Sequence, residues 1–290
     1  MIELRTGDVR LSIDAARGAR ISSMSVAGRS LILGPPDDSN AGIRWGSYLM
    51  APWAGRIAGG VLEWEGTTYQ LPQRDGPHAI HGLVYERSWT VDRTSTTSVE
   101  LSISLAGAGW PFGGHVRQRL ELRPDELLTS AEVRFDRTGP VVVGWHPWFL
   151  RGDDDPSVTV NGGETLETVD LIPTGRRLPI NAMTDLRSGP RLGDRQLDTI
   201  YPDATSPASI RWEELELAVE FDPPLRTVVV FTGDPRAVCV EPQSAWPNAP
   251  ALAARGIAGT GLATLAPGDT FSAAMRWRWG RAPGAHRTQP

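Results

Sequence analysis

Two residues capable of acid–base chemistry follow strongly apolar stretches of the sequence. His146 follows residues 141–143, is flanked by tryptophans, and precedes Pro147, which is expected to end regular strand pairing. Glu241 follows the apolar stretch 238–240, where an unpaired carboxylate would be costly to bury. A lone histidine is more often a hydrogen-bonded core residue. A histidine and a carboxylate that both stand at apolar strand ends favour an acid–base pair facing a cleft.

Four segments interrupt the strand-like pattern with residues that a plain scaffold does not require. They are residues 52–60, residues 78–83 with Trp89 downstream, residues 144–149 and residues 240–248. These segments contain Trp53, Trp145, Trp148 and Trp246, whereas Trp277 and Trp279 are expected in the core. Aromatic platforms beside hydrogen-bonding side chains suit the apolar C–H faces and the hydroxyls of a sugar ring.

The scarcity of lysine and cysteine in the chain excludes several classes of chemistry. All 29 basic residues are arginines, which excludes a lysine Schiff base and a P-loop. The single cysteine, Cys239, excludes an intrachain disulfide and a cysteine-based zinc site, and its apolar neighbours predict a buried, inert thiol. His78 and His81 are three residues apart, which in an extended segment places them on opposite faces. Residues 153–155 are expected to form a solvated acidic loop, so no metal and no cofactor is predicted.

Alternation of apolar and polar residues defines the expected elements. It is clearest over residues 99–105, 116–122, 127–135, 215–221 and 271–279, and it predicts half-buried antiparallel strands. Residues 226–232 and 141–143 are more continuously apolar, which predicts central strands covered on both faces. One short helix is expected over Ala249–Arg255, with Gly256 as its C-terminal cap. The pattern predicts an all-β fold, a single large antiparallel β-sandwich over residues 1–280, followed by a mobile tail over residues 281–290.

Composition limits the partners and the location of the chain. It has 290 residues, of which 40% are hydrophobic and 22% charged, and a net charge of −5 with both signs interspersed. This is the composition of a globular protein, without the basic patch that nucleic acid or an anionic membrane would require. The N-terminal residues lack the apolar core of a secretory signal, and no apolar stretch is long enough to span a bilayer. A cytoplasmic protein is expected, either a monomer or a weak homodimer.

Read in order, these segments resemble the aldose 1-epimerase (galactose mutarotase) family over residues 2–280. The matching motifs are Gly-Arg-Ile-Ala-Gly-Gly at 55–60, His-Gly at 81–82, Trp-His-Pro-Trp-Phe at 145–149, Leu-Asp at 197–198 and Glu-Pro-Gln-Ser-Ala-Trp-Pro-Asn-Ala at 241–249. Three positions depart from the usual family pattern: Gly55 replaces an asparagine, Trp145 replaces an asparagine or histidine, and Gln243 stands where many members have methionine.

The resemblance implies a galactose mutarotase-like supersandwich and a cofactor-free enzyme that interconverts the α and β anomers of an aldose. In this family pattern His146 is the general acid for the ring oxygen, and Glu241 is the base for the anomeric hydroxyl. Arg56, His81 and Asp198 are implied to bind sugar hydroxyls. Trp148 and Gln243 are expected to complete the substrate site. The residues alone do not separate Asp198 from an ordinary turn aspartate.

Three alternatives remain open at the level of sequence. A hexose-6-phosphate mutarotase would need arginines to converge at the cleft rim, and the candidates are Arg74, Arg87, Arg176 and Arg177. A non-catalytic sugar-binding module would not require an acid and a base together. A glycosidase would use Asp198 and Glu241 as its carboxylate pair, which leaves His146 without a role.

Overall fold

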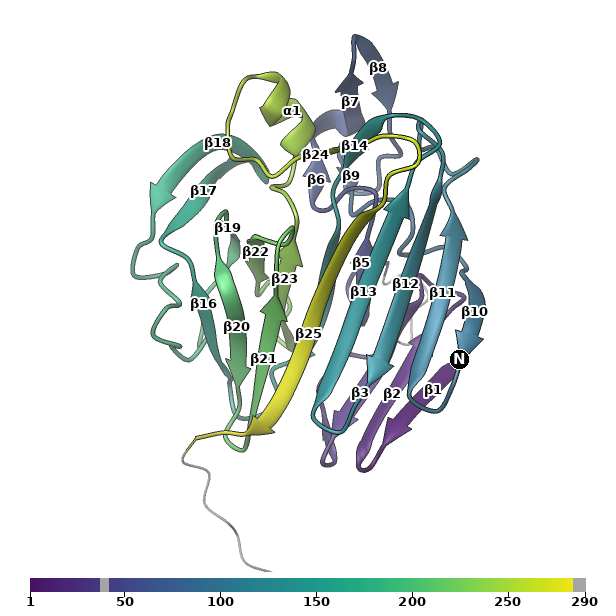
Figure 1. Ribbon diagram of the computed structural model, residues 1–290. Coiled ribbons are helices and arrows are strands. Elements are labelled where there is room, and N and C mark those ends of the chain that lie inside the picture. Colours follow the sequence, from purple (N-terminus) through teal and green to yellow (C-terminus); the bar gives the residue numbers. More distant parts are fainter. Residues whose placement is uncertain (37–41, 284–290) are drawn as a thin grey trace, which may run out of the picture.

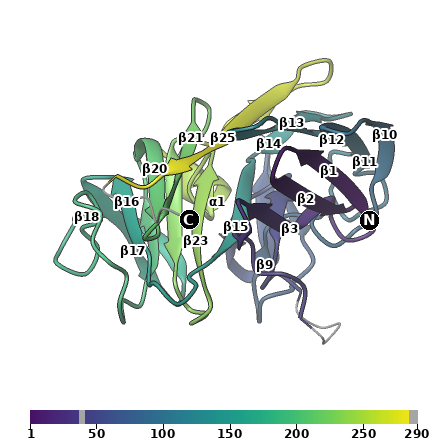
Figure 2. The same ribbon diagram turned by 90° about the horizontal axis from the view of Figure 1, so that it is seen from below.

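Two large antiparallel sheets pack face to face in the computed structural model, which describes residues 1–36 and 42–283 (Figures 1 and 2). The nine-stranded sheet has the order β1 (Ile2–Thr6), β2 (Val9–Asp14), β3 (Arg20–Val26), β5 (Ser47–Met50), β15 (Gly144–Leu150), β23 (Ala237–Gln243), β22 (Thr227–Phe231) and β19 (Asp198–Tyr201), with β4 (Arg29–Ser30) paired to β3. The eight-stranded sheet has the order β10 (Thr90–Thr94), β11 (Ser98–Ser104), β12 (His115–Leu122), β13 (Glu126–Arg134), β25 (Phe271–Arg281), β21 (Leu215–Phe221), β20 (Thr205–Arg211) and β16 (Ser157–Asn161).

The alternating segments of the sequence form neighbouring strands of one sheet. The five predicted strands correspond to β11, β12, β13, β25 and β21, which are adjacent and antiparallel in the eight-stranded sheet. Along β12 every second side chain is buried against the other sheet. The predicted all-β fold is confirmed, and the period of two is the physical reason that the sequence revealed it.

Small ribbons and one helix cover the ends of the sheets. They are the pairs β6 (Arg56–Ile57) with β9 (Ala79–Ile80), β7 (Val61–Trp64) with β8 (Thr67–Gln70), β14 (Gly139–Val141) with β24 (Ala263–Leu265), and β17 (Glu164–Val169) with β18 (Ile172–Pro179), together with the 3-10 turn η1 (Ala58–Gly60) and α1 (Ala249–Ala254). The helix lies where the sequence predicted it, and Gly256 follows it at φ +78°. No helix among the described residues is long and apolar enough to cross a membrane.

Three expectations need correction. Residues 141–143 are not a central strand: β14 pairs only with β24, and the N–H groups of Val142 and Val143 donate to Pro52 O and Ser244 Oγ at 2.9 Å. They are apolar because neighbouring loops bury them. Pro147 does not end its strand, since it pairs with Ser47 inside β15. β25 includes Arg281, the first residue of the expected tail, and residues 284–290 of that expected tail lie outside the described part of the chain.

The nine-stranded sheet has two different faces. Trp145 and Phe149 of β15 point into the core between the sheets, and Phe149 packs on Trp277 of the other sheet at a ring-centroid distance of 4.9 Å. His146 and Trp148 alternate with them and point to the opposite face. That outer face carries the candidate site.

Candidate active site

Alternation on adjacent strands gathers one set of side chains on the outer face of the nine-stranded sheet. The strands β5, β15, β23, β22 and β19 are consecutive neighbours, and they contribute Tyr48, His146, Trp148, Glu241, Gln243, Val229, Phe231, Asp198 and Ile200. All of these except Tyr48 line one pocket, which Arg56 of β6 and His81 also line. The pocket measures about 790 Å³, counting the space that opens to solvent at its mouth.

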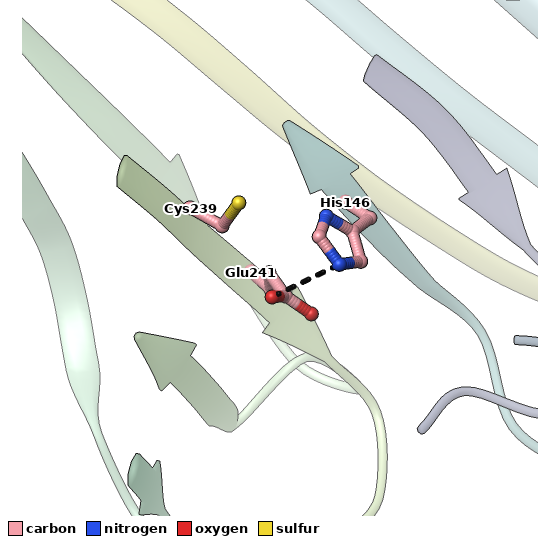
Figure 3. Close-up of side chains that lie close together, drawn as sticks. All are labelled: His146, Cys239 and Glu241. Carbon is pink, nitrogen blue, oxygen red and sulfur yellow. Dashed lines mark ion pairs between the residues drawn. The ribbon is translucent and has the colours of Figure 1, made fainter. Parts of the chain in front are cut away.

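His146 and Glu241 lie in direct contact at this pocket. The β15–β23 ladder pairs Gly144 with Gln243 and Trp148 with Cys239, which places His146 opposite Glu241. Nε2 of His146 is 3.3 Å from Oε1 of Glu241, and both side chains are buried apart from their exposure in the pocket (Figure 3). A cross-strand register therefore brings together two residues that are 95 positions apart in the sequence (241 − 146).

Aromatic rings fix the orientation of the His146 imidazole. Tyr48 stacks on it at a centroid distance of 5.1 Å, and Trp148 stacks on it at 5.2 Å with an interplanar angle of 12°. His81 meets it edge to face at 4.9 Å. The remaining nitrogen, Nδ1, is buried without a hydrogen-bond partner. Burial, assisted by the positive charge of Arg20, lowers the pKa of His146 to about 3.

The environment of Glu241 shifts its pKa in the direction opposite to that of His146. Burial raises the pKa of this carboxyl well above its usual value, and the negative charge of Asp198 adds to the effect. Gln243 donates a hydrogen bond of 3.3 Å from Nε2 to Oε2, which opposes the shift, as does the charge of Arg56. These opposite shifts favour the form of the pair in which Glu241 is protonated and His146 is neutral.

Arg20 packs against Tyr48, one of the two rings that stack on the His146 imidazole. Its guanidinium is buried and donates to the carbonyls of Gly42, Trp45 and Tyr85 at 2.9–3.0 Å. It also lies 4.5 Å from the centre of the Tyr48 ring. The sequence revealed neither Arg20 nor Tyr48, because an arginine at the start of a strand and a tyrosine in the short apolar run 48–50 carry no chemical signal.

Arg56 provides a polar wall of the pocket and is neutralised by carboxylates. Its Nε donates to Asp75 Oδ2 at 2.6 Å, and its Nη1 is 3.9 Å from Asp198 Oδ2. Burial raises the pKa of Asp198, although the charge of Arg56 opposes this. Asp75 was not predicted, since it lies in a polar loop without a motif. These groups offer donors and acceptors suited to hydroxyls.

His81 reaches the pocket through an unusual backbone. It has φ +55°, and the next residue, Gly82, has φ +82°. A Cβ atom on Gly82 would lie 2.0 Å from Ala51 O, so only glycine fits there. Burial lowers the pKa of His81 well below its usual value. His78 does not line the pocket; its Nδ1 accepts a hydrogen bond from Gly59 N at 3.2 Å.

The pocket brings together all seven residues that the sequence singled out, namely Arg56, His81, His146, Trp148, Asp198, Glu241 and Gln243. The expectation of several aromatic platforms is wrong for Trp53, Trp145 and Trp246. These three side chains are buried in apolar clusters and do not line the pocket: Trp53 and Trp145 belong to the main core, and Trp246 packs with Ile200, Val229 and Leu252. Trp277 and Trp279 lie in the core as predicted.

The four arginines considered for phosphate binding do not converge on the pocket. Arg74 pairs with Glu86, Arg176 with Glu167, and Arg177 with Glu164 and Asp203. Arg87 donates to the carbonyl of Ser104. Within the acidic loop, Asp154 and Asp155 form ion pairs with Arg29 and Arg151.

The fold is that of the galactose mutarotase-like β-sandwich proteins. A putative aldose 1-epimerase from Escherichia coli K12 superimposes with a TM-score of 0.85, at 21% identity over 97% of this chain and 98% of that one. A galactose mutarotase-like protein from Clostridium acetobutylicum superimposes with a TM-score of 0.84, at 18% identity over 97% and 95%. The chain belongs to the aldose 1-epimerase family, whose sequence model matches residues 1–278.

Curated relatives match parts of the chain. YihR, an uncharacterized protein of Escherichia coli K12, is 28% identical over 161 residues, which cover 51% of this chain and 49% of YihR. The galactose mutarotase of Sus scrofa is 30% identical over 152 residues, covering 48% of this chain and 44% of the pig enzyme. The chain thus spans about half the length of the curated relatives that it matches.

Proposed function

We propose that this protein is an aldose 1-epimerase that interconverts the α and β anomers of an unphosphorylated aldose. The observation that carries the proposal is the contact of 3.3 Å between His146 Nε2 and Glu241 Oε1 at a pocket with hydroxyl-binding groups. The ring oxygen and the anomeric oxygen are bonded to the same carbon. An acid and a base that serve both oxygens must therefore be close neighbours.

One proton on the pair is sufficient for the reaction. His146 donates it to the ring oxygen while Glu241 accepts the proton of the anomeric hydroxyl, and the bond between the anomeric carbon and the ring oxygen opens. The aldehyde rotates and recloses as the two groups return their protons. Burial favours the neutral form, with the proton on Glu241. Transfer of this proton from Glu241 to His146 Nε2 creates the reactive pair of imidazolium and carboxylate. No proton has to be exchanged with solvent.

The other pocket residues are assigned to substrate binding. Arg56 and Asp198 offer donors and acceptors to hydroxyls, and Gln243 provides an amide beside the carboxyl of Glu241. His81 lies against His146, where it can contact the ring oxygen. With Glu241 protonated, the carboxylates of Asp75 and Asp198 in the pocket offset its two arginines, Arg44 and Arg56. This balance of charge favours a neutral sugar over a sugar phosphate.

Two other functions account for less of the geometry. A binding module has no need for a buried acid in contact with a base. A glycosidase would pair Asp198 with Glu241, but Asp198 is the neighbour of Arg56, while Glu241 contacts His146.

Polarimetry of freshly dissolved α-glucose and α-galactose tests the proposal. The purified protein should speed the approach to anomeric equilibrium in the presence of a chelator. Glu241→Gln and His146→Ala should each lose about 10²-fold or more of the rate, because each group transfers a proton in the transition state. His115→Ala and Glu63→Gln, which lie outside the pocket, should retain the wild-type rate. Circular dichroism verifies the fold of each variant.

Two results would reject this function. Full activity in both pocket variants would exclude the assigned pair, and sugar binding by wild type without anomer exchange would indicate a binding module. A parallel assay with glucose 6-phosphate separates the phosphate alternative, since a clear preference for the phosphate would contradict the reading of the pocket charge.

A further inference from the structure

The cysteine that the sequence marked as inert lies beside the proposed acid–base pair. Cys239 precedes Glu241 by two residues in β23, so both side chains project from the same face of the sheet. Its strand partner across the ladder is Trp148, two residues from His146. One ligand atom from each of His146, Cys239 and Glu241 lies within 4.8 Å of the other two, and Figure 3 shows the three side chains facing a common space.

The side chains of His146, Cys239 and Glu241 are of the types that bind zinc in proteins. A thiolate, an imidazole and a carboxylate are each ligands of zinc, and thiolate favours thiophilic cations such as Zn²⁺ and Cd²⁺. Within residues 1–36 and 42–283, this is the group of His, Cys, Asp and Glu side chains whose geometry could hold such an ion.

Only a small movement of side chains is needed to bring the three ligand atoms to the spacing found around a zinc ion. Ligand atoms around a tetrahedral zinc ion are roughly 3.3–3.8 Å apart, given metal–ligand bonds of about 2.0–2.3 Å. Nε2 of His146 and Oε1 of Glu241 are already 3.3 Å apart. The sulfur must approach by about an ångström, through rotation of side chains. His146 and Glu241 line the pocket and Cys239 does not, so a cation reaches the thiol through the sugar site.

We propose that His146, Cys239 and Glu241 form an inhibitory site for a thiophilic divalent cation, with Zn²⁺ and Cd²⁺ as ligands. Coordination displaces the thiol proton and the carboxyl proton to solvent, and the imidazole binds through a neutral nitrogen. A water molecule or a sugar hydroxyl fills the fourth position. The bound cation removes both the acid and the base from proton transfer. Inhibition rests on the proposed function, whereas coordination does not.

The test uses the fact that Cys239 is the only cysteine in the chain. Any thiolate-to-metal charge-transfer absorption therefore reports this site. Titration of the full, untagged chain with Cd²⁺ should produce such a band in the ultraviolet, saturating at one equivalent. Cys239→Ser and Cys239→Ala should abolish the band, and Glu241→Gln should weaken binding at least about tenfold. His115→Ala, which is distant from the cluster, should titrate as wild type.

The wild-type protein and the same variants also test whether the cation inhibits anomer exchange. Zn²⁺ at saturating concentration should reduce the anomer exchange of wild type at least about tenfold, reversibly on adding a chelator, while Cys239→Ser or Cys239→Ala remains active at that concentration. No band in wild type, or a band that persists without Cys239, would overturn the site. A band without inhibition would overturn its inhibitory role. A one-equivalent band in a protein that shows no mutarotation in any condition would reject the proposed function and leave the metal site standing.

Discussion

Burial shifts the pKa values of His146 and Glu241 in opposite directions. The imidazole of His146 resists protonation because it is enclosed by Tyr48, Trp148 and His81 and lies near the buried charge of Arg20. The carboxyl of Glu241 resists ionisation for the same reason, the loss of solvent around it. Environments that separate two pKa values in this way are typical of acid–base sites.

The pH dependence of the reaction follows from these directions. The one-proton form of the pair gains a second proton only as pH falls toward the lowered His146 value of about 3, and loses its proton only well above the ordinary carboxyl value of 4.5. We expect kcat/KM to stay level as pH falls through 6.5, the ordinary imidazole value. Polarimetry in overlapping buffers measures this profile, and an acid limb centred near pH 6.5 would contradict it.

At the scale of elements, a two-residue turn determines how His81 enters the site. His81 and Gly82 both have positive φ, and a bridge pairs Gly82 with Ala51. The close approach of Ala51 O leaves no room for a side chain at position 82. The His-Gly motif of the sequence therefore has a steric cause in the glycine as well as a chemical one in the histidine.

Replacing Gly82 by alanine tests this steric argument. Gly28 is a matched control, because it has the same φ of +82° and no atom within 4 Å of an added Cβ. We expect Gly28→Ala to lower the free energy of unfolding by about 1–2 kcal/mol, the cost of a left-handed alanine. Gly82→Ala should cost about 1–3 kcal/mol more, since the backbone must also move. Urea denaturation measures both, and equal losses would refute the role of the Ala51 contact.

At the scale of the whole molecule, the second sheet holds the strand that carries His146. Phe149 of β15 packs on Trp277 of β25, and Trp145 donates from Nε1 to Gln118 Oε1 of β12 at 3.4 Å. The eight-stranded sheet thus has no residue in the pocket and still fixes the strand that supplies the proposed acid. One core shared by both sheets is the physical basis for expecting a single domain over residues 1–280.

Cooperative unfolding is the measurable consequence of that shared core. We expect one denaturant transition in which far-UV circular dichroism, tryptophan fluorescence and catalytic activity are lost together. Trp277→Ala should lower the free energy of unfolding by about 3–5 kcal/mol, because it leaves a cavity between the sheets. Val91→Ala, at an exposed position, should have little effect. Loss of activity in a separate, earlier transition would show that the sheets unfold independently.

The sequence by itself predicted five strands of the eight-stranded sheet and the short helix, and its resemblance to a family pointed to seven residues that are among those lining the pocket. Alternation and helix capping are local patterns, and motifs mark residues whose chemistry a scaffold does not need. Two of the errors in the expectations from sequence share a cause. The apolar run 141–143 and the tryptophans of the motif segments were assigned by residue type, but burial depends on which distant elements pack above them.

Only the tertiary structure decided how the site is assembled. Strand order and register place Tyr48, Cys239 and Glu241 beside His146, which is far from them in the chain. Burial at this place, with the charges of Arg20, Arg56 and Asp198, shifts the pKa values of His146 and Glu241. The physical reason is that a pKa, a stacking contact or a metal-ligand distance depends on separation in space. Pairing between strands fixes that separation, and no local pattern of residues encodes it.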